Sequence, residues 1–260
     1  MNNFRKYGSE PISVALIHGG PGAAGYLKPV AEELSKSVGI IEPFQTESTI
    51  DGQIEELRKI LKTNATLPVT LIGHSWGAWL SVIFASENPS YIKKLILVSS
   101  GPFDDSYVKA LNDTRMSRLS VDDVKELNEL KLSLDNPSLQ NKIEIFKRFG
   151  KLSGKTDDYS PLDKTDYTLV NNPDIFQTVN REALYLRKSG KLLRMAGRVK
   201  CPVIAIHGSY DPHPFKGVEE PLAGVLSDFK FYLLDNCGHN PWNEAEAKND
   251  FYEILNKEIE

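Results

Sequence analysis

The stretch PVTLIGHSWGAWL, from Pro68 to Leu80, decides the fold because it joins an apolar run to an apolar helical pattern through a serine with a glycine two residues away on each side. Its centre, GHSWG at residues 73–77, matches the pattern G-x-S-x-G. Between a strand and a helix, this pattern makes a sharp turn that holds the serine in a strained backbone conformation and exposes its hydroxyl. The stretch therefore predicts a strand–turn–helix unit with Ser75 as a nucleophile at the edge of a sheet.

Further apolar, β-branched runs indicate the other strands of this sheet. With Val69–Ile72, they are Ile12–Ile17, Val38–Phe44, Leu95–Val98, Val203–Ile206 and Phe229–Leu234. Helical patterns lie at Tyr26–Ser37, Ile50–Lys62, Trp76–Ser86 and Asn243–Ile259. Runs that are apolar on both faces and alternate with helices predict an α/β fold, with a doubly wound sheet of about six parallel strands.

The alternation stops in the middle of the chain, where helical patterns dominate. They cover Ser120–Leu134, with Ser120 as the N-cap, and also Asn141–Leu152 and Thr178–Met195. We therefore expect three parts: a first part of the core at residues 1–102, a helical cap insertion at 103–196, and the rest of the core at 197–260.

Composition excludes several classes of function. The 260 residues carry a net charge of −4 without a block of Lys or Arg, so electrostatics favour neither a nucleic-acid partner nor an anionic membrane. The N-terminus lacks the apolar segment of a signal peptide, and no apolar run approaches the ~18 residues of a membrane span. The two cysteines and five histidines show no metal-ligand spacing. We expect a cytoplasmic protein without a metal or cofactor.

A glycine-rich loop, ALIHGGPGAAGYL at residues 15–27, allows two interpretations. Residues 20–25 fit the dinucleotide pattern G-x-G-x-x-G, and Glu42 ends the next apolar run, where a ribose-binding acid belongs. Alternatively, its backbone N–H groups stabilise an oxyanion. Pro21 favours the oxyanion because proline has no N–H to offer a pyrophosphate.

A base and an acid for Ser75 follow two later strands. Asp211 comes just after one predicted strand, and His239 comes just after the next. Their order along the chain and their position at carboxyl ends of parallel strands match a Ser-Asp-His triad. Asp235 is a second candidate acid, but it precedes the loop that carries the base, so Asp211 is preferred.

The motifs HGGPG at residues 18–22 and GHSWG at residues 73–77 resemble those of the proline-iminopeptidase-like group of α/β-hydrolases. The resemblance covers the core on both sides of the insertion. It implies Ser75 as nucleophile, His239 as general base and acid, and Asp211 as the residue that orients the base. It also implies that the backbone N–H groups of Gly20 and Trp76 form the oxyanion hole, with Gly19 the less favoured donor.

The chain departs from that group in two places. The usual N-terminal hairpin looks missing, which is why about six strands are expected. The three tryptophans, Trp76, Trp79 and Trp242, all lie outside the insertion, so the Trp-rich cap segment of iminopeptidases is absent from the sequence. We therefore predict a serine hydrolase acting on an ester, thioester or amide of a small molecule. The alternatives are an aminopeptidase of the proline-iminopeptidase type and a non-enzymatic ligand-binding protein.

The insertion contains side chains that suit either kind of substrate. Its acids, which are surface charges or ligands of a substrate amine, are Asp157, Asp158, Asp163, Asp166, Asp174 and Glu182. Its aromatics, which form a core or line an apolar pocket, are Phe146, Phe149, Tyr159, Tyr167, Phe176 and Tyr185. The sequence leaves open which of them face the site, and it leaves open the oligomeric state.

Overall fold

The fold is built on one seven-stranded sheet. We analysed a computed structural model, which describes residues 3–136, 139, 142–163, 165 and 167–259. The strands are β1 (Phe4–Tyr7), β2 (Ile12–Ile17), β3 (Gly39–Pro43), β4 (Val69–His74), β5 (Ile92–Val98), β6 (Val203–Gly208) and β7 (Phe229–Leu234). Their order across the sheet is β1-β3-β2-β4-β5-β6-β7, and the six strands β2 to β7 run parallel to one another. The predicted α/β fold with six parallel strands is confirmed.

The structure adds one strand that the sequence patterns did not indicate. β1 forms the edge of the sheet and pairs antiparallel with β3, with Phe4 opposite Pro43 and Tyr7 opposite Ile40. Its sequence, FRKY, lacks a continuous apolar run because an edge strand is covered less completely than a central one. Since β3 separates β1 from β2, these first two strands do not form a hairpin with each other.

Alternate residues of the strands face two separate hydrophobic layers, as a doubly covered sheet requires. One layer joins Ile17, Leu71 and Leu97 to helices on the first face, and the other joins Leu16 and Ile96 to helices on the second. The first face is covered by α2 (Ile50–Asn64), α3 (Trp76–Glu87), α8 (Lys191–Ala196) and α9 (Lys216–Ala223), and the second by α1 (Lys28–Leu34) and α10 (Lys248–Ile259).

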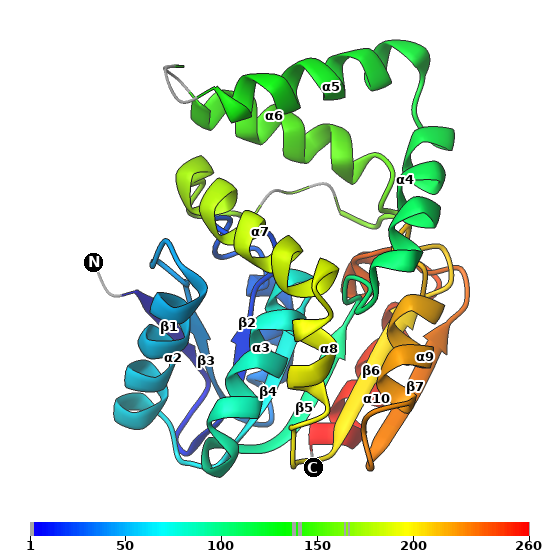
Figure 1. Cartoon of the computed structure of the whole chain (residues 1–260). Helices are drawn as coiled ribbons and strands as arrows, with labels where there is room; N and C mark the ends of the chain where they lie inside the picture. The colour runs from blue at the N-terminus through cyan, green and yellow to red at the C-terminus, as the bar shows by residue number, and fades with distance from the viewer. Residues whose placement is uncertain (1–2, 137–138, 140–141, 164, 166, 260) are drawn as a thin grey trace.

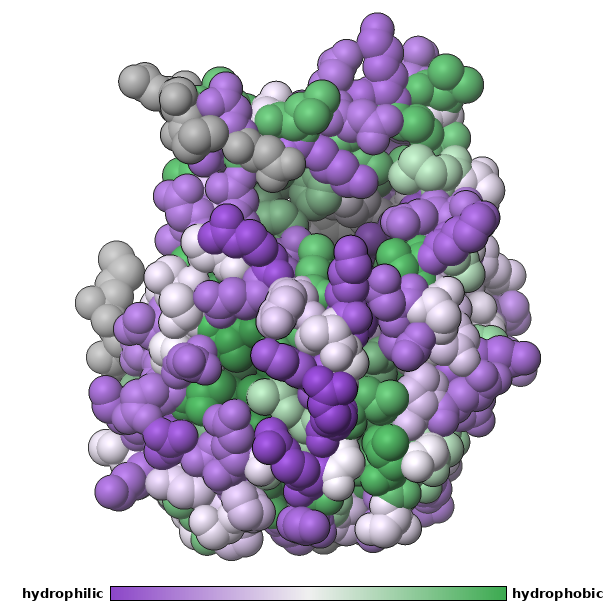
Figure 2. All heavy atoms as spheres, viewed as in Figure 1, coloured by the Kyte–Doolittle hydropathy of each residue, from purple (hydrophilic) through white to green (hydrophobic). Residues whose placement is uncertain are grey.

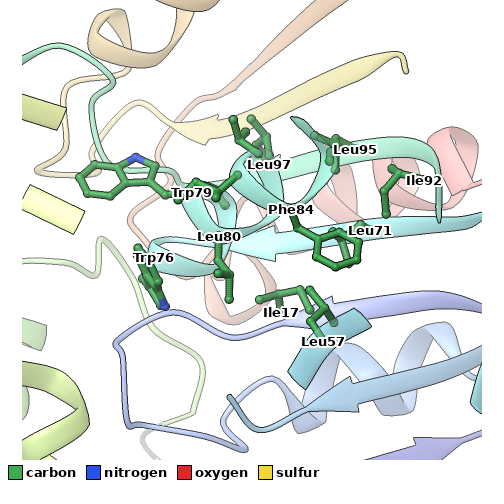
Figure 3. Packing of buried hydrophobic residues seen from close by; sticks show 14 of the residues in the cluster. Ile17, Leu57, Leu71, Trp76, Trp79, Leu80, Phe84, Ile92, Leu95 and Leu97 are labelled. Carbon is green, nitrogen blue, oxygen red and sulfur yellow. The ribbon is translucent and has the colours of Figure 1, made fainter. Parts of the chain in front are cut away.

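Helix α3 is the most deeply buried helix of the first face. Every residue from Trp76 to Ala85 is buried, which explains why this segment is apolar all round. Figure 3 shows its side chains between the strands and α2, where Phe84 lies near Leu71 and Leu57. This packing fixes the first turn of α3, and therefore the backbone around Ser75, relative to the sheet.

The residues between β5 and β6, hereafter the insertion, are mainly helical. They form α4 (Val108–Ser117), α5 (Val121–Asp135), α6 (Lys142–Gly154), α7 (Pro173–Lys188) and α8. Helices α5 and α6 pack side by side above α7, at the end of the sheet where the parallel strands terminate (Figure 1). Figure 2 shows a hollow in the molecular surface between these upper helices and the body of the protein.

Two predicted helices have different limits in the structure. The segment predicted as one helix up to Met195 is split into α7 and α8, because Gly190 adopts a left-handed conformation with φ of 68°. The terminal helix begins at Lys248 instead of Asn243. Residues 244 and 245 instead contact the insertion, where the backbone N–H of Ala245 bonds the carbonyl of Ser160. By contrast, Ser120 caps α5 as predicted.

Candidate active site

Ser75 lies in a strained turn between β4 and α3. Its φ of 54° and ψ of −116° are unusual for a residue with a side chain. Small residues are required on both sides, since a Cβ on Gly73 would lie 2.3 Å from the carbonyl oxygen of Gly77, and a Cβ on Gly77 would lie 2.2 Å from that of Ile17. Close backbone packing therefore explains the two glycines of GHSWG. Of the five residues in this motif, Ser75 is partly exposed and the other four are buried.

Asp211 and His239 are joined by a short hydrogen bond, with Nδ1 of His239 2.7 Å from Oδ2 of Asp211. The other oxygen of Asp211 accepts from the backbone N–H of His213 at 2.9 Å and lies 2.8 Å from Nδ1 of the same residue. Asp235, the alternative acid, is exposed and makes no hydrogen bond to His239 within the described residues. The loops after β6 and β7 therefore bring together Asp211 and His239.

Charges around this pair favour an ionised acid and a readily protonated base. Burial opposes a charge on Asp211, but His239, His213 and His207 outweigh it and hold the pKa of the carboxyl well below its usual range. Burial alone would lower the pKa of His239, yet Asp211 reverses this and the pKa is raised, with Asp157 contributing. His213 is different, because burial dominates and lowers its pKa to about 4, so it stays neutral near pH 7.

Ser75 lies beside these residues without a direct bond to the base. The ring of His74, its neighbour in sequence, is centred 4.7 Å from the ring of His239. Within the described residues, no hydrogen bond joins the Ser75 hydroxyl to His239. Such bonds commonly tighten only when a substrate is present, so the missing bond does not argue against proton transfer between the two.

The glycine loop after β2 packs directly against Ser75. A Cβ on Gly19 would lie 2.7 Å from Cβ of Ser75, so only glycine fits there. The N–H of Gly19 is occupied, since it donates to the hydroxyl of Tyr26 at 2.6 Å. Gly20 follows in a left-handed conformation with φ of 49°. Of the two candidate donors in the loop, this leaves the N–H of Gly20 without a protein acceptor among the described residues.

A hydrogen-bond chain that the sequence patterns did not indicate connects the glycine loop to the base. The hydroxyl of Tyr26 lies 2.5 Å from Nδ1 of His74, and Nε2 of His74 lies 2.9 Å from the carbonyl oxygen of His239. Burial lowers the pKa of His74 well below its usual range, so its ring is neutral. A neutral ring accepts from Tyr26 and donates to His239, which satisfies both partners. In the sequence, the only hints of these bonds are Tyr26 in the glycine-rich stretch and His74 in GHSWG.

The loop that carries His239 is anchored to the insertion by Glu244. This buried carboxylate accepts the backbone N–H groups of Gly238 and Tyr159 at 2.9 and 2.8 Å, and that of Ser160 at 2.6 Å. In addition, the N–H of His239 donates to the carbonyl of Asp157 at 2.7 Å. His239 is therefore held between the core and the insertion.

Acids of the insertion are paired with other parts of the protein. The partners are Arg115 for Asp157, Asn240 for Asp158, Thr165 for Asp163, Lys142 for Asp174 and the backbone N–H of Ile50 for Glu182. Asp166 lies outside the described residues. The described acids thus have structural partners, which makes each of them a poorer ligand for a substrate amine.

Aromatic residues of the insertion take several positions. Phe146 and Phe149 pack against Phe176, with ring centroids 4.9 and 5.9 Å apart, and form a core between α6 and α7. Tyr159 packs against Tyr210, which lies in the loop before Asp211. The other two predicted candidates face outward: Tyr167 bonds Asp163, and Tyr185 is exposed.

Other predicted ligand positions are occupied by protein contacts. Glu42, the candidate ribose ligand, is buried and its carboxylate bonds Arg5 at 2.6 Å and Tyr7 at 3.0 Å. Asp211, His213 and His239 form a cluster whose ligand atoms all lie within 4.8 Å of one another, but these atoms already bond each other as described above. Each described helix is too short or too polar to cross a lipid bilayer.

The strained serine turn and the Asp211–His239 pair lie at the carboxyl ends of the parallel strands of one sheet. Residues 13–243 match the model of a family described as alpha/beta hydrolase fold. The chain belongs to the α/β-hydrolase family. As a member, it is a hydrolase enzyme. The expectation of an α/β-hydrolase fold is thereby confirmed.

Individual relatives of this α/β-hydrolase are distant. It is 24% identical to a proline iminopeptidase of Heyndrickxia coagulans, in an alignment covering 93% of this chain and 90% of the relative. Among solved structures, it is similar to VinJ, with a TM-score of 0.71, 16% identity, and coverage of 98% and 93%. It is also similar to the monoacylglycerol lipase of Paleococcus ferrophilus, with a TM-score of 0.64, 14% identity, and coverage of 98% and 97%. The likeness to the two structures shows a shared fold alone.

Proposed function

We propose that this α/β-hydrolase cleaves an ester, thioester or amide of a small molecule through an acyl-enzyme on Ser75. The observation that carries the proposal is the 2.7 Å bond between Asp211 and His239 beside a strained serine turn. Asp211 fixes the ring so that Nδ1–H points at the carboxylate, which leaves Nε2 as the proton acceptor. The helices α4 to α7 are proposed to form a cap over this site.

The reaction follows from these roles. Ser75 Oγ attacks the substrate carbonyl while its proton passes to Nε2 of His239, and the carbonyl oxygen becomes an oxyanion. The N–H groups of Gly20 and Trp76 donate to that oxygen. When the tetrahedral intermediate collapses, the bond to the leaving group breaks and His239 returns the proton to it. Water then attacks the acyl-enzyme with His239 as base, and Ser75 regains its proton as the acid product leaves.

Gly20 is the preferred donor of the glycine loop because its neighbour is engaged. The N–H of Gly19 bonds Tyr26, whereas that of Gly20 has no protein acceptor among the described residues. A pair of preorganised N–H groups of this kind is worth about 10²–10³ in rate per donor. The proposal therefore gives the glycine loop an electrostatic role instead of a nucleotide-binding one.

An aminopeptidase of the proline-iminopeptidase type is the second candidate function. The HGGPG and GHSWG motifs and the relative from Heyndrickxia coagulans favour it. The structural partners of Asp157, Asp158 and Glu182 count against it, because a free substrate amine needs an acid that is available to it. We therefore rank an ester or related acyl substrate first.

Initial rates on p-nitrophenyl butyrate and prolyl-p-nitroanilide, measured side by side, test the function and the ranking. We expect faster cleavage of the ester and a loss of about 10⁴-fold or more in kcat for Ser75→Ala. Ser86→Ala, on the far end of the same helix, is the matched control and should keep its activity. An active, folded Ser75→Ala protein would contradict the serine mechanism, and faster cleavage of the anilide would favour the aminopeptidase.

A serine-directed fluorophosphonate separates catalysis from simple ligand binding. The expected result is stoichiometric labelling of Ser75 and no labelling of Ser75→Ala. Folded wild-type protein that resists the reagent would instead favour a binding protein. We also propose, from the composition and from the two unpaired cysteines, that the enzyme acts in the cytoplasm, which cell fractionation tests.

A further inference from the structure

The C-terminal end of helix α4 carries two arginines that contact the segment holding His239. The helix stands above the carboxyl ends of the strands, beside α5 and α6 (Figure 1). Arg115 lies in its last turn, and Arg118 is its C-cap residue. Both contact the segment at residues 156–157, whose backbone also holds His239.

Arg118 has a complete set of structural contacts. Its Nη1 donates to the carbonyl of Thr156 at 2.6 Å, and its guanidinium lies 3.6 Å from the centre of the Tyr210 ring. This arrangement joins α4 to the loop before Asp211 through a hydrogen bond and a cation–π contact. Arg118 therefore serves to position the segment.

Arg115 is much less well satisfied. Its one hydrogen bond to a described residue is from Nη2 to Oδ1 of Asp157, and this bond is 3.3 Å long. Its Nε is buried and has no acceptor within the part of the chain that the structure describes. The side chain as a whole is 26% exposed, so it is only partly enclosed by the protein. A guanidinium carries five N–H donors, and a half-buried one that uses a single donor has capacity for another acceptor.

The position of Arg115 relative to the base suits a substrate contact. Arg115 is linked to His239 through one residue, since its Nη2 bonds the carboxylate of Asp157 and the carbonyl of Asp157 accepts the N–H of His239. The positive charge of Arg115 also lowers the pKa of both His213 and His239. Arg115 is thus a partly free cation beside the reacting groups.

We propose that Arg115 binds a carboxylate of the substrate, so that the preferred substrates are acyl compounds that carry a carboxylate near the scissile bond. This rests on the proposed serine hydrolase function of the same site. The planar guanidinium matches a carboxylate through two parallel N–H···O bonds, which a lysine cannot provide. Asp157 uses one end of the guanidinium and holds it in place, while the remaining donors stay available.

The surrounding charges agree with an anionic ligand. The five described candidate acids of the insertion are engaged by protein partners, and Asp157 in particular is shared between Arg115 and the hydroxyl of Thr156. The cation of Arg115, whose Nε has no acceptor among the described residues, therefore stands where an amine would need a free carboxylate. A carboxylate would complete the hydrogen bonding of Arg115, whereas an amine would face repulsion from it.

The test compares anionic and neutral esters of similar size. Mono-4-nitrophenyl glutarate carries the carboxylate on the acyl side, with 4-nitrophenyl hexanoate as its neutral partner. 4-Butyryloxybenzoate carries it on the leaving group, with phenyl butyrate as its neutral partner. For at least one pair, we expect the wild-type kcat/KM to favour the anionic ester by about tenfold to hundredfold, the factor that one or two charge-assisted hydrogen bonds supply.

Substitution of Arg115 should abolish that preference. In Arg115→Met the ratio of kcat/KM for the anionic ester to that for the neutral ester is expected to fall to about one. In Arg115→Lys it should fall to an intermediate value, because the positive charge remains but the two parallel N–H donors are lost. Arg148→Met is the matched control, since Arg148 pairs with Glu126 between α5 and α6, and its ratio should equal that of wild type. A purely structural Arg115 would lower the rates on both esters together and leave the ratio unchanged.

A binding measurement makes the inference independent of turnover. Calorimetry with the anionic ester on Ser75→Ala protein should show binding that is weakened about tenfold or more in Ser75→Ala/Arg115→Met. If wild type cleaves neutral and anionic esters equally and the added Arg115→Met leaves binding unaltered, the carboxylate site is refuted while the hydrolase function stands. If no ester is cleaved and the fluorophosphonate does not label Ser75, the proposed function fails, and the calorimetry still decides whether Arg115 binds a carboxylate.

Discussion

The hydroxyl of Tyr26 lies 2.5 Å from Nδ1 of His74 and accepts the N–H of Gly19 at 2.6 Å, so one side chain joins the glycine loop to the residue before Ser75. Since Nε2 of His74 contacts the carbonyl of His239, the same chain reaches the loop of the base. Burial raises the pKa of Tyr26, which keeps its hydroxyl neutral and able to donate. These hydrogen bonds thus fix the glycine loop, the turn of Ser75 and the loop of His239 relative to one another.

Removing this hydroxyl in Tyr26→Phe leaves the Gly19 N–H and the His74 ring nitrogen without a buried partner. We expect the free energy of unfolding to fall by about 1–3 kcal/mol, the cost of an unsatisfied buried group. We also expect kcat to fall more than KM changes, because the oxyanion loop loses its anchor. Denaturant unfolding and steady-state kinetics measure the two effects. Tyr252→Phe is the control, and equal losses in both variants would contradict a specific role for Tyr26.

The hydrogen bond between Asp211 and His239 predicts which carboxylate matters for catalysis. Asp211→Asn should lower kcat by about 10³–10⁴-fold, because an amide in that place favours the wrong tautomer of the base. Asp235→Asn should keep near wild-type activity, since Asp235 is exposed and makes no bond to His239 within the described residues. Rates on a p-nitrophenyl ester distinguish the pair, and a larger loss in Asp235→Asn would reverse the assignment.

The raised pKa of His239 predicts how the rate depends on pH. A general base must be unprotonated, so kcat/KM should rise as pH increases through a midpoint above 6.5, the ordinary value for histidine. Asp157 contributes to the raised pKa, so Asp157→Asn should move this acid limb to lower pH. Profiles of kcat/KM against pH for both proteins test the sign. A shift to higher pH would show that Asp157 acts on the base in another way.

Glu244 predicts a stability effect centred on the loop of the base. Its carboxylate accepts three backbone N–H groups, and Glu244→Gln both removes the charge and points an N–H at one of them. We expect a loss of about 1.5–3 kcal/mol in the free energy of unfolding, the range for hydrogen bonds to charged groups.

Glu246→Gln provides the matched control for Glu244. It lies two residues further along the chain, is exposed, and bonds only the side chain of Asn236 among the described residues. Its unfolding free energy should stay within about 0.5 kcal/mol of wild type. Thermal or denaturant unfolding of the two variants measures the difference, and indistinguishable values would refute the anchoring role of Glu244.

The sequence by itself determined the architecture of the core, because the signals involved are local. Residues 68–80 place a β-branched run, two glycines and an apolar helix within one stretch, and the structure has a strand, a turn and a helix there. The same holds for the other apolar runs, which match β2, β3, β5, β6 and β7, and for the N-cap at Ser120. Periodicity and turn chemistry act over a few residues, so they can be read without knowledge of the fold.

The tertiary structure alone decided how distant groups meet. The order of the residues along the chain favours Asp211 over Asp235 as the acid, but only the packing of the loops after β6 and β7 joins Asp211 to His239. Likewise, only the fold shows that Tyr26 occupies the N–H of Gly19 and that Asp157 links Arg115 to His239. Hydrogen bonds and charges depend on distances between side chains far apart along the chain, and those distances are set by the packed sheet and the insertion above it.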